Sequence, residues 1–217
     1  MSICNYTPTQ EEIENTLISR HGLELHTKFK NASVAICGLG GLGSNIAIAL
    51  ARAGIGRLHL IDFDKVDLSN IHRQQYLLSQ IGMYKTDAIR STLQAINPYI
   101  DVISDMQAVT EENITKLLEH ESVICEAFDN PQAKAMLVNT VSEIFPQKYI
   151  VSASGIAGIS SANSITTRKI TEHFYLCGDG MSDIADDMGL ISARVMVCAA
   201  HQAHAILRIV AGVDIFE

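Results

Sequence analysis

The feature that most constrains this chain is a glycine-rich turn between a strand-like run and a helix-like run. The turn reads Gly-x-Gly-Gly-x-Gly over residues 38–43, between the β-branched run 34–37 and the apolar run 46–53, which Gly54 can cap. Glycines permit a tight turn and a close backbone approach, and the following helix N-terminus attracts phosphate. Asp62 ends the next apolar run, about 20 residues on, where a carboxylate can bind ribose hydroxyls. The pattern predicts an adenine-nucleotide site; the alternative is a tight turn in an α/β protein that binds nothing.

A long polar stretch follows this second run. It covers residues 62–76 and contains three carboxylates, an amide and a guanidinium, namely Asp62, Asp64, Asp67, Asn70 and Arg73. A nucleotide triphosphate needs acceptors for its ribose, and donors and a cation for its phosphates. Lys85 lies in the first turn of the next predicted helix, where the helix dipole disfavours a cation unless that cation meets an anion. The alternatives are a solvated charged loop and a solvated lysine.

Strand-like and helix-like segments alternate as far as residue 153. Strands are predicted over 34–37, 57–62, 100–104, 122–127 and 148–153, and helices over 9–30 (interrupted at 20–22), 46–54, 82–96, 111–120 and 132–145. Two short strands within 159–176, a loop over 177–189 and a helix over 190–211 complete the chain. This order predicts a Rossmann-like α/β fold, with a mostly parallel twisted sheet, helices on both faces and a short antiparallel extension near the C-terminus.

Asp129 follows the predicted strand 122–127. It therefore lies at the carboxyl edge of a parallel sheet, where open α/β sheets bind ligands. It could equally cap the helix that begins near Pro131, and the two roles are compatible.

Composition excludes several classes of function. The formal net charge of -8 argues against nucleic acid as the partner, since phosphate backbones require clusters of Lys and Arg. The chain shows no secretory signal and no isolated apolar stretch long enough to span a membrane. The 5 cysteines form no CxxC pair and are read as reduced thiols, so a cytoplasmic location is expected.

These motifs resemble the ThiF/MoeB family, relatives of the ubiquitin-activating enzymes, and the short length is most similar to compact ThiF proteins of thiamine biosynthesis. The matching segments, in the family's order and spacing, are 38–43, 53–56, 62–66, 69–74, Gly82 with Lys85, 97–98 and 129–130. The resemblance implies one ThiF-like adenylyltransferase domain over 1–217. Its parts would be an N-terminal helical segment (1–30), a nucleotide-binding core (31–153) and a carrier-binding extension with the C-terminal helix (154–217).

The resemblance also implies a reaction and a set of site residues. The family uses ATP and Mg²⁺ to adenylate the C-terminal glycine carboxylate of a small ubiquitin-fold sulfur-carrier protein that ends in Gly-Gly. The implied catalytic residues are Arg73, Lys85 and Asp129, with Asp129 also binding Mg²⁺. The implied nucleotide contacts are Gly38, Gly40, Gly41, Gly43, Asp62, Asp64, Asn70, Arg73, Gln74 and Lys85. A homodimer is expected, because helices 46–54 and 190–211 carry more apolar surface than one sheet face can cover.

The sequence departs from larger family members in two places, and one cysteine resembles a thiol that some relatives use. It lacks their two CxxC pairs, so no structural zinc is expected, and Cys198, His201 and His204 fit a packed helix better than a metal site. Only Arg20 is available to match an N-terminal arginine that reaches a neighbouring subunit's ATP. Cys177, expected at the start of the loop, is a candidate transfer thiol, with an incidental semi-exposed thiol as the alternative.

Two other functions compete with this one. A nicotinamide-dependent oxidoreductase would explain the glycines and Asp62 but not the remaining polar motifs. A non-catalytic partner subunit would keep the fold without the activity. The pathway, whether thiamine, molybdopterin or another, is not specified by these motifs.

Overall fold

A computed structural model describes residues 6–183, 185 and 189–214 of the chain. A seven-stranded sheet with the order β3-β2-β1-β4-β5-β7-β6 forms its centre. The strands are β1 (Ser33–Cys37), β2 (Arg57–Ile61), β3 (Asp101–Asp105), β4 (Val123–Glu126), β5 (Tyr149–Ala153), β6 (Thr166–Lys169) and β7 (Phe174–Gly178). All neighbouring strands run parallel except the β6–β7 pair, which is antiparallel. The predicted Rossmann-like architecture with its antiparallel extension is confirmed.

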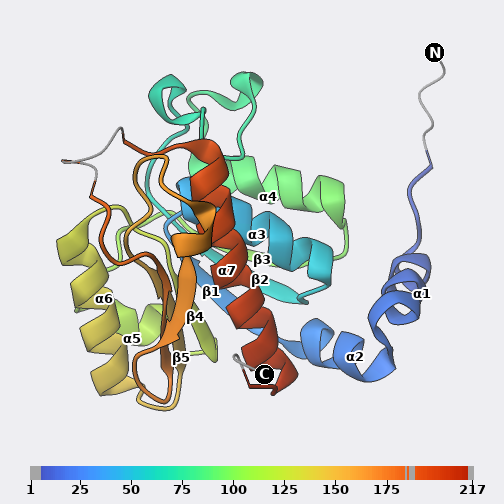
Figure 1. The fold of residues 1–217 in the computed structure, drawn as a ribbon. Coiled ribbons are helices and arrows are strands. Elements are labelled where there is room, and N and C mark those ends of the chain that lie inside the picture. The colour runs from blue at the N-terminus through green and yellow to red at the C-terminus, as the bar shows by residue number, and fades with distance from the viewer. Residues whose placement is uncertain (1–5, 184, 186–188, 215–217) are drawn as a thin grey trace.

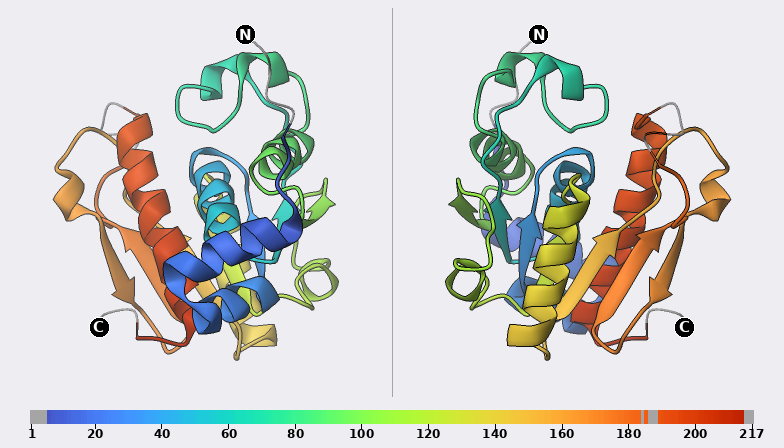
Figure 2. Two further views of the ribbon diagram at one scale, coloured as in Figure 1. Left: turned by 90° about the vertical axis from the view of Figure 1, so that its right-hand side faces the viewer. Right: turned by 90° about the vertical axis from the view of Figure 1, so that its left-hand side faces the viewer.

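Helices cover both faces of the sheet (Figures 1 and 2). One face carries α2 (Leu23–Asn31), α3 (Gly41–Ala53), α4 (Lys85–Ile96) and α7 (Ser192–Ala211), and the other carries α5 (Ile114–Leu117) and α6 (Pro131–Ile144). The strand β1 shows why helices are needed on both faces. Val34 and Ile36 pack into the core beneath α3 and α7, whereas Ala35 and Cys37 pack into the core beneath α5 and α6. No helix in the described ranges is long and apolar enough to cross a membrane.

The N-terminal segment forms two helices, as the interruption at residues 20–22 predicts. The helix α1 (Gln10–His21) begins at a Thr9 capping box with Glu12, and Gly22 adopts a φ of 83° between α1 and α2. α1 has no buried residue, so it packs only loosely against the body of the protein.

Three sequence expectations are wrong in their boundaries. The helix expected from residue 46 begins at Gly41, so the last three residues of the glycine motif belong to its first turn. The helix expected over 111–120 is α-helical only over Ile114–Leu117, because the Asn113 side chain accepts the Thr110 N–H and donates to the Ala108 carbonyl, each at 2.8 Å. These bonds hold a turn in place of the first helical turn. The loop expected over 177–189 begins later, because Cys177 and Gly178 belong to β7.

A buried histidine at the centre of β2 supplies a pH-dependent contribution to stability. His59 contacts Asp105 through Nε2 at 2.8 Å and Glu121 through Nδ1 at 3.1 Å. Burial lowers the pKa of His59, but the hydrogen bonds with Glu121 and Asp105 outweigh burial and raise it overall. A raised folded-state pKa stabilises the protein fully below the unfolded-state value of about 6.5.

We therefore expect the wild-type free energy of unfolding to fall as pH rises from about 6.5 through the folded pKa of His59. His59→Gln removes this dependence, while His204→Gln, at an exposed position of α7, retains it. Urea titrations at several pH values measure the effect. A parallel pH dependence in wild type and His59→Gln would contradict it.

Candidate nucleotide site

A cavity of about 560 Å³ opens at the carboxyl ends of the parallel strands, where β1 and β4 lie side by side. The strand order reverses there, which is where open α/β sheets bind ligands. The structure brings nearly all of the sequence-predicted site residues to this cavity: Gly38, Gly40, Gly41, Asp62, Asp64, Asn70, Arg73, Gln74, Lys85 and Asp129. Gly43 does not line it. A Cβ at Gly43 would lie 1.8 Å from the Gly38 carbonyl oxygen, so this glycine packs α3 against the turn.

The glycine turn is held from both sides. Asp62 accepts the Leu39 N–H at 2.6 Å through one carboxylate oxygen and the Asp64 N–H at 2.7 Å through the other. Tyr76 donates to the Leu39 carbonyl at 2.7 Å. The buried Asp62 therefore fastens the turn to the end of β2, a role that the sequence did not reveal, and its remaining lone pairs can still accept from ribose hydroxyls.

Lys85 meets anions of its own chain. A short backbone pairing between residues 64–66 and 82–85 closes the intervening segment and sets Lys85 beside Asp64. The buried Lys85 Nζ lies 2.7 Å from Asp64 Oδ2 and 3.9 Å from Asp62 Oδ2. These two ion pairs explain why a cation is tolerated in the first turn of α4, and they hold the Lys85 ammonium at the cavity.

Arg73 and Asp129 both line this cavity, and they are close enough for the Asp129 charge to act on Arg73. Arg73 donates from Nη2 to the Asn70 side chain at 3.0 Å, while its Nε is buried without a hydrogen-bond partner. Burial lowers the pKa of Arg73 and the nearby Asp129 charge partly offsets this. Within the described ranges, no hydrogen bond or ion pair engages the Asp129 carboxylate. Because Mg²⁺ in nucleotide sites takes one or two carboxylates plus phosphate oxygens, Asp129 fits that ion.

Two charged residues at this site were missed by sequence reasoning. Glu126 ends β4 with no exposed surface, and Lys134 on α6 contacts both of its carboxylate oxygens at 3.0 and 2.8 Å. Lys134 also lines the cavity. The only signal in the sequence is an acidic residue at the end of an apolar strand, which does not identify its partner.

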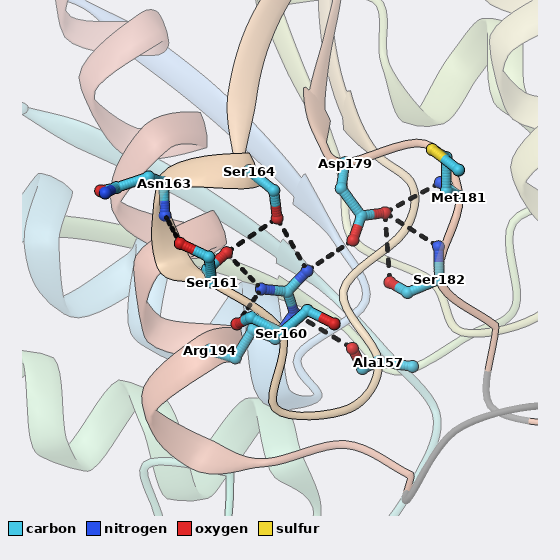
Figure 3. A network of polar contacts seen from close by, with 9 residues as sticks. All are labelled: Ala157, Ser160, Ser161, Asn163, Ser164, Asp179, Met181, Ser182 and Arg194. Atoms are coloured by element: carbon cyan, nitrogen blue, oxygen red, sulfur yellow. Dashed lines mark hydrogen bonds and ion pairs between the residues drawn. The ribbon is translucent and has the colours of Figure 1, made fainter.

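The far end of the cavity is lined by the crossover segment (residues 154–165), which joins β5 to β6, and by the residues that follow β7. Figure 3 shows how Arg194, at the start of α7, holds both. Its guanidinium donates to the carbonyls of Ala157, Ser160 and Ser161 at 2.8–3.0 Å and pairs with Asp179 at 2.5 Å. Arg194 is thus a buried structural cation.

Arg20 lies away from this cavity. It belongs to the last turn of α1, and no residue of α1 lines the cavity. A contact with the ATP of a neighbouring subunit stays a prediction.

Cys177 is a strand residue and not the semi-exposed loop thiol that the sequence suggested. It is fully buried in β7, with its Sγ 3.5 Å from Thr167 Oγ1, which also contacts His201 Nδ1 at 3.0 Å. Burial raises the pKa of the Cys177 thiol to about 11. The reactive thiolate is therefore scarce at neutral pH.

We expect Cys177 to resist alkylation by N-ethylmaleimide at pH 8 in the folded protein and to react in urea. Peptide mass spectrometry after a timed exposure gives the extent of labelling. Rapid labelling of Cys177 in the folded protein would contradict its burial.

In the described ranges, no group of three or more His, Cys, Asp and Glu residues is arranged to hold a metal ion. Cys37, Cys125, Cys177 and Cys198 are all buried free thiols. Cys4 lies outside the described residues.

The parallel sheet with helices on both faces makes the chain a Rossmann-like protein. The glycine turn, the cations Arg73 and Lys85 and the carboxylate of Asp129 make up its candidate nucleotide site. Comparison with known proteins gives its family. Residues 14–216 match the ThiF family, and the chain belongs to that family.

Three similar proteins illustrate the relationship. The adenylyltransferase and sulfurtransferase MOCS3 of Culex quinquefasciatus is 29% identical over 212 residues, which are 91% of this chain and 46% of that protein. The chain thus spans less than half the length of this relative. Escherichia coli TcdA, a tRNA N6-threonylcarbamoyladenosine dehydratase solved with ATP, superposes with a TM-score of 0.85 at 19% identity, covering 95% of this chain and 98% of TcdA. E. coli MccB, solved with AMPCPP and MccA, gives 0.69 at 21% identity, covering 88% and 60%.

Proposed function

We propose that this chain is an ATP-dependent adenylyltransferase that activates the C-terminal glycine carboxylate of a small ubiquitin-fold sulfur-carrier protein, releasing pyrophosphate. We further propose a ThiS-like carrier and a role in thiamine (thiazole) biosynthesis. The observation that carries the proposal is the convergence of Arg73, Lys85 and Asp129 on one cavity beside the glycine turn. A dinucleotide oxidoreductase has no need for this arrangement of phosphate-binding charges.

The reaction needs positioning and charge neutralisation more than proton transfer. A carboxylate oxygen of the carrier attacks the α-phosphorus of ATP, a new O–P bond forms, and the bond to the β-phosphate oxygen breaks as pyrophosphate leaves. Because the nucleophile is already an anion, no general base is required. Arg73 and Lys85 would offset charge on the α-phosphate and the departing pyrophosphate. Asp129 would hold Mg²⁺, which when bound supplies further charge neutralisation at the phosphates.

The far end of the cavity suits a narrow peptide terminus. Small residues line it, namely Ala153, Ser154, Gly155 and Ala157. Gly155 cannot carry a side chain, because a Cβ there would lie 2.0 Å from Asp179 Oδ1. An extended Gly-Gly tail, which lacks side chains, would fit between these residues. The MOCS3 relative, by its name an adenylyltransferase and sulfurtransferase, supports the same class of reaction.

The decisive experiment is ATP–pyrophosphate exchange with purified candidate carriers that end in Gly-Gly. Exchange that requires an intact Gly-Gly terminus is the expected result, with a carrier lacking the final glycine as the control. A thermal shift with MgATP and none with NADH would separate this function from an oxidoreductase. Nucleotide binding with no exchange for any carrier would favour a non-catalytic partner subunit.

We also propose that the protein is a homodimer. The expected surface was on α3 and α7, but these helices bury their apolar faces against each other and the sheet. Exposed apolar side chains gather instead on the segment between β2 and α4, which projects at the top of Figure 2: Phe63, Leu68, Leu77, Leu78, Ile81 and Met83. A second copy could cover this surface.

Light scattering at micromolar concentration should therefore report twice the chain mass of 23.6 kDa. Leu78→Asp, at a side chain that is 69% exposed, should shift the protein toward the monomer without unfolding it. A wild-type protein seen only at 23.6 kDa would contradict the dimer.

A further inference from the structure

The buried carboxylate of Glu126 binds the turn that carries Asp129 to the elements around it. It accepts the Phe128 N–H at 2.6 Å, the Lys134 ammonium through both oxygens, and the Ser152 hydroxyl from β5. No other carboxylate in the described ranges combines complete burial with so many donors. One side chain thus joins the end of β4, the first turns of α6 and the neighbouring strand.

Asp129 lies between two fixed points of this turn. On one side Glu126 holds the backbone of Phe128, and on the other the Asn130 side chain caps α6 by accepting the Ala133 N–H at 2.9 Å. The turn also touches the glycine turn, because a Cβ at Gly38 would lie 2.8 Å from the Ala127 carbonyl oxygen. Any shift of this turn therefore moves Asp129 relative to the phosphate-binding backbone.

We propose that Glu126 and Lys134 are a positioning pair that holds the Asp129 carboxylate in the geometry that Mg²⁺–nucleotide requires. The inference rests on the proposed function, which assigns Asp129 to the metal. The pair acts through Asp129 and not by touching the reacting atoms. Residues that orient a metal ligand commonly change metal affinity by about 10-fold or more when they are replaced.

The test measures ATP affinity by calorimetry with and without Mg²⁺, which needs no turnover. The quantity compared is the Mg²⁺ factor, which is the ratio of the ATP affinity with Mg²⁺ to the ATP affinity without it. We expect this factor to exceed one in wild type and to fall to one in Asp129→Asn. We expect Glu126→Gln and Lys134→Met each to reduce the factor by about 10-fold or down to one. Glu126 does not line the cavity, so Glu126→Gln should also leave the affinity for ATP alone nearly unchanged. Lys134→Arg preserves the ion pair and should restore most of the factor.

Lys148→Met is the matched control. Lys148 is also a buried lysine, but it binds the Leu118 and Glu119 carbonyls at the amino end of β5, the edge opposite the cavity. Its replacement should lower stability and leave the Mg²⁺ factor unchanged. The double variant Glu126→Gln with Lys134→Met removes both charges together, so it remains informative if either single variant fails to fold.

Each outcome bears on a different statement. A wild-type Mg²⁺ factor in Glu126→Gln and Lys134→Met, with loss in Asp129→Asn, would overturn the positioning role alone. A wild-type factor in Asp129→Asn would overturn the assignment of Asp129 to the metal. Failure of wild type to bind ATP would overturn the proposed function itself.

Discussion

Arg73→Ala and Lys85→Ala should each lower adenylation by roughly a hundredfold or more, since losing one preorganised charge contact in such a site costs about 3 kcal/mol. Both side chains line the cavity beside the glycine turn. Arg73 has a buried Nε with no hydrogen-bond partner, and Lys85 has its ammonium fixed by Asp64. The measurement is pyrophosphate exchange at saturating ATP and carrier.

Arg52→Ala is the matched control, because Arg52 is an exposed cation in the last turn of α3, at the opposite end of that helix from the cavity. It should keep wild-type exchange. Circular dichroism should show that the fold survives in all three variants. Near-normal exchange in Arg73→Ala or Lys85→Ala would remove that residue from the site.

Gly43→Ala should produce the largest loss of stability among single substitutions in the turn. The added Cβ would lie 1.8 Å from the Gly38 carbonyl oxygen, and backbone cannot rotate away as a side chain can. Overpacking of this kind costs about 3 kcal/mol. Urea unfolding measures the loss, and ATP affinity should fall with it because the turn must shift.

Gly40→Ala gives the comparison for stability. A Cβ at Gly40 would meet only the Gln74 side chain, at 3.7 Å, and no backbone atom opposes it. Its stability should stay within about 1 kcal/mol of wild type, the usual cost of replacing a glycine N-cap by alanine. Equal losses at positions 40 and 43 would show that close packing at Gly43 is unimportant.

The sequence predicted the strand–turn–helix unit, the parallel sheet and most of the residues that line the cavity. Those features follow from local rules: apolar periodicity, glycine at a tight turn, and the common edge at which parallel strands end. The residues that the sequence missed depend on partners distant in the chain. Glu126 could be seen to end a strand, but not to contact Ser152 on a neighbouring strand.

The errors have a similar physical origin. Cys177 was placed in a loop because glycines and acidic residues follow it, yet pairing of β7 with β5 and β6 extends the strand through Gly178. The predicted helix over 111–120 was shortened by side-chain bonds of Asn113. Pairing between strands and capping by side chains are tertiary effects that periodicity does not encode.

The first turn of α7 connects the two ends of the cavity. Arg194 holds the crossover segment and Asp179, whereas the next residue, Val195, packs on the glycine turn: a Cβ at Gly41 would lie 3.0 Å from Val195 Cγ1. Because the two residues are adjacent on one rigid helix, the end of the cavity that would receive the acyl group and the end that would receive phosphate cannot move independently. A ligand that displaces either end of the cavity therefore also displaces the other end, because both ends contact the first turn of α7.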